Sequence, residues 1–218
     1  ADVGVAVRGR LENLQSNLLV PGRELSAARL DLRADRTEAV LRGAVRLDGV
    51  PLDLRIVRPR GPGADGATRI EGQVPLSRDT LERLGIALPG VALGGAAVGN
   101  FTLDLAPDTP PLLRVVSDLN RLGLAAPWLG AAKPANARGS FELAGTLGPA
   151  PRFETLRLAF DGLDLEGALS LREEGLLERF EITRLAAGRW LDVRGTLVGS
   201  GVRGQPPRLV LSGGRLDL

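Results

Sequence analysis

The chain has 218 residues with 28 basic and 26 acidic side chains, 3% aromatic residues, and no His, Cys, Met or Tyr. The missing imidazole, thiol and phenol groups serve most catalytic and metal sites, so we expect no enzyme activity, no cofactor and no bound metal. The charges are interleaved and aromatic rings for base stacking are scarce, so we also expect no nucleic-acid binding.

Alternating apolar and polar residues predict a long succession of β-strands. In chain order these strands are expected at residues 3–11, 25–33, 39–47, 51–57, 68–75, 97–105, 112–117, 137–147, 153–160, 163–171, 177–184, 190–197 and 208–211. Short links at 161–162, 173–175 and 187–188 are typical of hairpin turns, so neighbouring strands should pair antiparallel. A Gly/Pro-rich segment at 58–66 predicts a loop, and residues 118–136 show the least regular pattern.

One short segment has the pattern of a helix. Ser77 suits the N-cap and Asp79 the first turn, Leu81 and Leu84 supply an apolar stripe, and Gly85 predicts the end. Two helical turns are marginal alone, so we expect this helix to pack on the sheet as a local lid or plug.

A five-residue pattern, apolar–x–Gly–x–apolar, recurs in six of the expected strands. Its glycines are Gly9, Gly43, Gly72, Gly145, Gly167 and Gly195. Residues two apart in a strand share a face, so each unit places a glycine and two apolar side chains together. A glycine inside a strand marks a bend or a close approach to the backbone, and central glycines let a sheet curve over its apolar face.

About a dozen hairpin-linked strands with one apolar face could close into a barrel, form a sandwich, or curl into an open trough. An ordinary closed core is the usual fate of such a face, and in that setting Trp128 and Trp190 would be packing anchors. The recurring glycines favour the open trough. The acidic residues of 161–167 lack the spacing of a calcium loop, so we interpret them as outward-facing strand residues.

The segment 113–124 reads LRVVSDLNRLGL and is followed by Pro127, Leu129 and Lys133. It resembles a segment of the AsmA-like family, whose YhdP-type members repeat a strand, the letters SDL, a short link, a second strand and then Pro, Leu and Lys. The resemblance covers about residues 37–218. This chain departs from the pattern at 120–121, where relatives often have a glycine step, and at position 128, where Trp replaces a small residue or Pro.

The resemblance implies an all-β fold, a long, strongly curved antiparallel sheet that forms an open hydrophobic groove, with one short helix. Residues 1–218 would be a section of a repeating β-groove domain and a fragment of a longer protein. AsmA-like proteins resemble bridge-like lipid-transfer proteins, so the implied function is non-enzymatic transport of phospholipid across the periplasm toward the outer membrane. The implied partners are phospholipid acyl chains, and the inner and outer membranes through regions outside this fragment. The resemblance also implies that the full-length protein is anchored in the inner membrane of a Gram-negative bacterium. No apolar run of 18 residues occurs in this chain, so the anchor would lie outside this fragment.

The residues expected to line the groove share one parity within each predicted strand. They are Leu41, Val45, Leu54, Ile70, Val74, Phe101, Leu103, Phe141, Leu143, Leu147, Leu158, Phe160, Leu165, Leu169, Phe180, Ile182, Val193 and Leu197. The alternative is a closed β-sandwich or β-solenoid, serving as a structural or interaction module of a periplasmic or surface scaffold.

Overall fold

The computed structural model describes residues 6–17, 23–62, 64–86, 88, 90–173, 175–202 and 204–217, and the fold is all-β. The strands are β1 Val7–Ser16, β2 Leu25–Ala34, β3 Glu38–Leu47, β4 Val50–Pro59, β5 Thr68–Ser77, β6 Ala92–Leu105, β7 Leu112–Ser117, β8 Leu122–Ala126, β9 Ala131–Lys133, β10 Gly139–Thr146, β11 Arg152–Phe160, β12 Leu163–Leu171, β13 Leu177–Ala187, β14 Leu191–Val198 and β15 Arg208–Leu216. The helical elements are α1 Arg78–Arg83 and the 3-10 turn η1 Pro127–Leu129.

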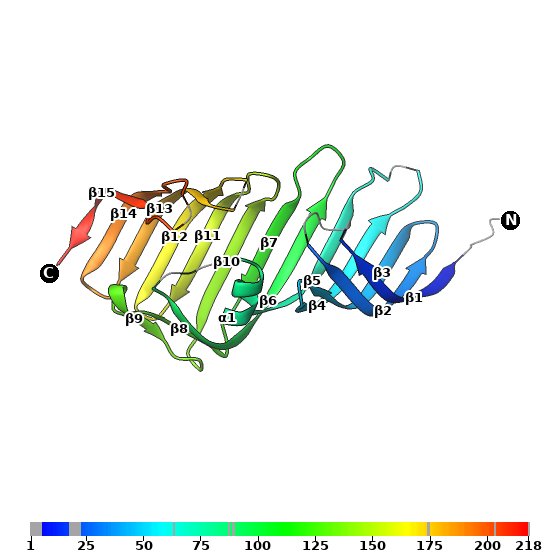
Figure 1. Ribbon diagram of the computed structural model, residues 1–218, viewed down its shortest axis with the longest axis horizontal. Coiled ribbons are helices and arrows are strands. Elements are labelled where there is room, and N and C mark those ends of the chain that lie inside the picture. The colour runs from blue at the N-terminus through cyan, green and yellow to red at the C-terminus, as the bar shows by residue number, and fades with distance from the viewer. Residues whose placement is uncertain are drawn as a thin grey trace.

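Most strands form one long antiparallel sheet, the main sheet, which runs from β1 through β7 and then from β10 to β15 (Figure 1). Every pair of neighbours follows chain order except β7 and β10, between which β8 and β9 leave the path. In the described part of the chain β1 and β15 lie at opposite ends and do not pair with each other. The open antiparallel sheet is therefore confirmed, and the chain closes into neither a barrel nor a sandwich.

The predicted strands all occur, with differences at their ends. β6 begins five residues before the prediction, at Ala92, and β15 continues to Leu216. The segment 118–136 is more regular than predicted, because it contains β8, η1 and β9. Residues 3–5 of the first predicted strand and Glu174 of one predicted turn lie outside the described residues.

The predicted helix is confirmed as α1. The hydroxyl of Ser77 accepts a hydrogen bond from the Thr80 amide at 3.2 Å, and Arg83 Nε lies 2.8 Å from the Asp79 carboxylate one turn earlier. Gly85 follows the helix with φ of +75°, the left-handed conformation that glycine adopts at little cost. The Thr80 side chain is buried, so one side of this short helix packs against β5 and β6.

The strand register gives the main sheet one apolar face and one polar face, because directly opposed residues lie on the same side. One row of opposed residues on the apolar face is Leu54, Gly72, Phe101, Val115, Leu143, Leu156, Gly167, Ile182, Gly195 and Leu211. A row on the polar face is Asp53, Gln73, Asn100, Val116, Glu142, Arg157, Glu166 and Arg184. Charged and amide groups thus fill the polar rows, and glycine and large apolar residues fill the apolar ones.

A small second layer covers part of the apolar face. Residues 96–105 of β6 pair within the main sheet, whereas residues 92–95 pair with β8, which in turn pairs with β9. Gly95, with φ of +78°, lies at this division and packs against the carbonyl oxygen of Arg121. We call residues 122–133 the cover. Together with α1 it lies along one long edge of the sheet, the lower rim, opposite the hairpin turns of the upper rim (Figure 1).

Candidate functional site

The candidate site is the apolar face of the main sheet, which we call the trough. Of the residues predicted to line it, ten are half-buried and belong to none of the packed core clusters. These ten are Ile70, Val74, Phe101, Leu103, Leu143, Leu147, Leu165, Leu169, Phe180 and Leu197. Their partial exposure leaves apolar surface along the trough that the described residues do not cover.

The remaining predicted lining residues are packed against protein. Leu41, Val45, Leu54, Phe141, Leu158, Phe160 and Val193 belong to or pack against core clusters, and Ile182 is also buried. The largest cluster joins the cover to the lower part of β11–β14, where Leu129 and Ala131 of the cover meet Phe160 and Val193. The register places these residues on the apolar face, and part of that face is an ordinary closed core.

All of the recurring glycines except Gly9 mark places where a neighbouring strand comes very close. A β-carbon on Gly43 would lie 2.7 Å from the carbonyl oxygen of Arg29, and one on Gly195 would lie 2.6 Å from that of Val210. Gly145 and Gly167 meet neighbouring backbone in the same way. Pairing registers shift at Gly145, Gly167 and Gly195, as at β-bulges, so these glycines permit the local bends that curve the sheet.

Two of these glycines also seat aromatic rings of the trough. A β-carbon on Gly72 would lie 2.8 Å from Cε1 of Phe101, and one on Gly167 would lie 2.7 Å from Cε2 of Phe180. Each ring therefore lies over the neighbouring backbone instead of standing upright. The pattern of glycine opposite a large residue keeps the trough floor apolar and shallow.

The polar face carries a series of cross-strand ion pairs. Arg69 Nε lies 2.6 Å from the Asp104 carboxylate, Arg114 Nη2 lies 2.9 Å from Glu142, and Arg184 Nη1 lies 2.8 Å from Asp164. Hydrogen bonding to Asp104 raises the pKa of the Arg69 guanidinium above its ordinary value. These exposed pairs add little stability each, but they show which face is suited to water.

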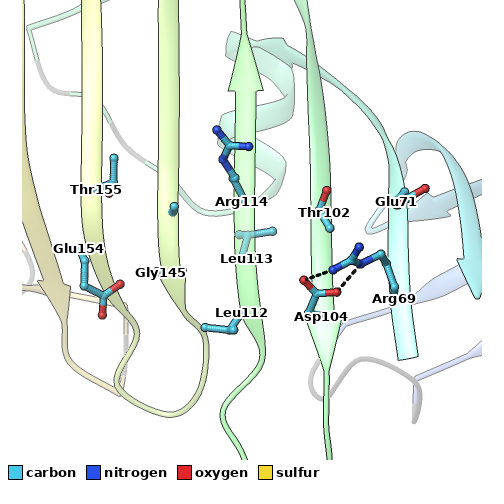
Figure 2. A pocket seen from close by; sticks show the side chains of 11 residues that line it. Arg69, Glu71, Thr102, Asp104, Leu112, Leu113, Arg114, Gly145, Glu154 and Thr155 are labelled. Atoms are coloured by element: carbon cyan, nitrogen blue, oxygen red, sulfur yellow. Dashed lines mark hydrogen bonds and ion pairs between the residues drawn. The ribbon is translucent and has the colours of Figure 1, made fainter. Parts of the chain in front are cut away.

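A shallow hollow of about 500 Å³ lies on this polar face and is lined by Arg69, Asp104, Arg114 and Glu154 (Figure 2). Its arginines are engaged by carboxylates, and it holds no nucleophile–base pair of the kind that covalent catalysis uses. Among the residues that the structure describes, no three His, Cys, Asp or Glu side chains gather to hold a metal ion. Two of the acidic residues of 161–167 likewise contact arginines, Asp164 at Arg184 and Glu166 at Arg157.

The SDL segment and the lone lysine form one buried structure. Lys133 is 3% exposed, and its ammonium donates hydrogen bonds to the carbonyl oxygens of Leu119 and Leu122, both at 2.8 Å, and of Pro134 at 3.3 Å. The Ser117 hydroxyl accepts from the Leu119 amide at 3.1 Å, where Leu119 has φ of +53°. Lys133 thus fixes the start and end of the cover to each other. Its unique occurrence in an arginine-rich chain was the signal available in the sequence.

The two tryptophans differ in how far they are buried. Trp190 is half-buried and packs against the large cluster under the cover, as predicted for a packing anchor. Trp128 is 62% exposed, so the same prediction is wrong for it. Its ring rests on Gly90, 3.2 Å from the position of a β-carbon there, at the outer surface of η1.

Comparison of the chain with protein-family models, with curated proteins and with solved structures finds no match. No helix in the described ranges is both long and apolar enough to cross a membrane. Functional evidence therefore comes from the trough, its cover and its rims.

Proposed function

We propose that the chain is a non-enzymatic section of a lipid-conducting trough, which holds phospholipid acyl chains while their headgroups stay in water. The observation that carries this proposal is the continuous row of apolar and glycine residues from β4 to β15, half-buried over much of its length. A closed core would bury such a row fully. An open one leaves a surface that acyl chains can occupy.

The energetics of the trough suit transport. Thirteen strands spaced about 4.8 Å apart give a floor of roughly 60 Å, and each buried methylene contributes about 0.8 kcal/mol. The same kinds of side chain repeat along the floor, so the free energy of a bound chain changes little as it moves. A lipid is therefore held along the trough without one deep site that would trap it.

The resemblance of residues 37–218 to the AsmA-like family supports the cellular setting of the proposal. In that setting the trough carries phospholipid across the periplasm toward the outer membrane, and other parts of the protein reach both membranes. The Ser-Asp-Leu and Lys-Pro residues that carry the resemblance hold the cover in place here.

Native mass spectrometry of the purified chain incubated with phosphatidylglycerol tests the proposal. We expect discrete lipid adducts that disappear with Leu143→Asp, because a carboxylate would then stand on the trough floor. Ala144→Asp is the matched control, since residue 144 is one position along β10 and faces the polar side, opposite Arg114. Circular dichroism checks that both variants fold. Equal lipid loading of the two folded variants, or a wild type without adducts, would contradict the proposal.

A scaffold or interaction module is the second candidate. All nine residues of β15 are exposed, including Leu209 and Leu211, and the strand pairs with β14 on one side only, so its outer edge could pair with another chain. A wild-type protein that forms edge-dependent assemblies and takes up no lipid would favour this candidate.

A further inference from the structure

The apolar face carries one charged residue among those that the described register places on it. This residue is Arg58, near the upper end of β4. It lies directly opposite Ala39 and two residues beyond Ile56, so it is on the same face of the sheet as Ile56 and Leu54. Its neighbour Pro59 is on the polar face. Every other residue that the register assigns to this face is apolar, Gly, Ser or Thr.

A second arginine stands beside it. The backbone amide of Arg60 donates to the Thr37 carbonyl at 2.7 Å, so the loop after β4 is tied to the turn between β2 and β3. Arg58 and Arg60 are both exposed. The pKa of the Asp35 carboxyl is lowered chiefly by the hydrogen bond from the Thr37 hydroxyl and also by the charge of Arg60, so Arg60 lies near an acid. The Arg58 guanidinium has no ion-pair partner among the described residues and is available at the upper rim.

The acidic side chains near this rim either accept hydrogen bonds from the local backbone or lie on the polar face. The Asp35 carboxylate accepts from the Thr37 amide and hydroxyl at 2.8 and 2.7 Å, and from the Glu38 amide at 3.0 Å. Asp65 accepts from the amide two residues later, and Glu38 is paired with Pro59 on the polar face. Arg58 consequently places a positive charge on the trough side of this rim.

The distances along β4 match a lipid chain. At about 3.3 Å per residue, Leu54 lies roughly 13 Å and Val50 roughly 26 Å below Arg58. One acyl chain covers about half of a bilayer core, or about 15 Å. A chain whose headgroup sits at Arg58 would therefore pass Ile56 and end near Leu54, which is half-buried where it packs against the N-terminal core cluster. It would stop short of Val50, which is 1% exposed and closed to ligand.

We propose that Arg58, assisted by Arg60, binds the phosphate of a phospholipid at the upper rim while the acyl chains lie on the trough below. This inference rests on the proposed function and adds the orientation of the lipid and its headgroup chemistry. The covered lower rim and the positive upper rim would together align each lipid with its phosphate upward. Guanidinium suits this role because it presents several donors to phosphate oxygens.

The test compares two lipids with the same chains. Binding of dioleoylphosphatidylglycerol and of dioleoylglycerol, which lacks the phosphate, is measured for the wild type and for Arg58→Glu. We expect Arg58→Glu to weaken binding of the phospholipid about tenfold, the scale of one charge-assisted hydrogen bond, and to leave dioleoylglycerol unchanged. Arg33→Glu is the matched control, because Arg33 lies near the same rim on the polar face, opposite Val40. It should bind both lipids like the wild type.

The other possible outcomes distinguish a wrong headgroup site from a wrong proposed function. Unchanged phospholipid binding by folded Arg58→Glu, or an equal loss in Arg33→Glu, would overturn the headgroup assignment and leave the trough intact. Inorganic phosphate that binds as tightly as the phospholipid would also overturn it, since the arginines would then act without the trough. A wild type that binds neither lipid would instead refute the proposed function itself.

Discussion

Two parts of the same apolar face have different surroundings. Toward the N-terminus, Ala27, Leu30 and Val45 pack within the sheet, with half-buried side chains of the same strands around them. Toward the C-terminus, the corresponding face of β11–β14 lies under the cover, and side chains from two layers meet. The strand pattern is the same in both parts. A second layer therefore closes the C-terminal core, whereas the N-terminal core forms from side chains of the sheet itself.

The largest difference between the two parts is expected for phenylalanine truncation. Phe160→Ala, under the cover, should lower the free energy of unfolding by about 3–5 kcal/mol, because it leaves a cavity in a closed core. Phe101→Ala, in the uncovered part, should cost about half as much, since that ring is already partly exposed. Urea unfolding of both variants measures this. Similar losses would mean that the two parts are equally closed.

Removing the Lys133 ammonium should release the cover. Lys133→Met keeps the apolar stem but removes the ammonium donor from the carbonyl oxygens of Leu119, Leu122 and Pro134. The Leu119 and Pro134 oxygens still accept backbone amides, so the loss should be about 1–3 kcal/mol. Hydrogen exchange should then rise in β8 and β9 before it rises in β3 and β4. Arg138→Met, at an exposed position before β10, is the control and should change stability by less than about 0.5 kcal/mol. Uniform exchange across both parts would show that Lys133 holds the whole fold and not the cover.

The motif glycines should separate into tolerant and intolerant positions. A β-carbon on Gly167 would collide with the Glu181 carbonyl and with Phe180, so Gly167→Ala should cost about 2 kcal/mol through displaced strands. Gly9 has the same sequence context, but its nearest contact would be Leu32 Cδ2 at an ordinary 3.8 Å. Thermal denaturation of Gly9→Ala should therefore match the wild type within about 0.5 kcal/mol. Equal effects would imply that the glycines act through strand propensity alone.

Much of the fold was predictable because it depends on local rules. Strict alternation places Leu143 and Leu165 on one face, and short turns such as 161–162 require antiparallel neighbours. The cover was missed because residues 122–133 contain two very short strands around a turn, whose pairing with β6 is a long-range contact. The role of Arg58 was hidden for a related reason. From the sequence alone, a charged residue at the end of an apolar pattern is assigned to a loop. The strand register is needed to show on which face of the sheet it lies.

The smallest effect is expected from acid, and it should appear first in the uncovered part. The Asp48 carboxylate accepts from Arg23 Nη1 at 2.7 Å and from the Glu24 amide at 2.9 Å, and these bonds hold its pKa below the ordinary value of about 4. A lowered pKa means that the contribution to stability is complete above the unfolded pKa and is lost as pH falls through the folded one. Below about pH 4, hydrogen exchange should therefore rise at the β3–β4 turn as the Asp48 carboxylate becomes protonated.

Asp48→Asn provides the control for this acid effect. The amide keeps the shape of the side chain without a titrating group, so the variant should be less stable at neutral pH and should lose less on acidification. An acid response of the turn that is the same in Asp48→Asn would assign it to other carboxylates, such as Asp31 and Asp35, whose pKa values are lowered by hydrogen bonds from Arg29 and Thr37. The contrast between the two parts would then rest on packing alone.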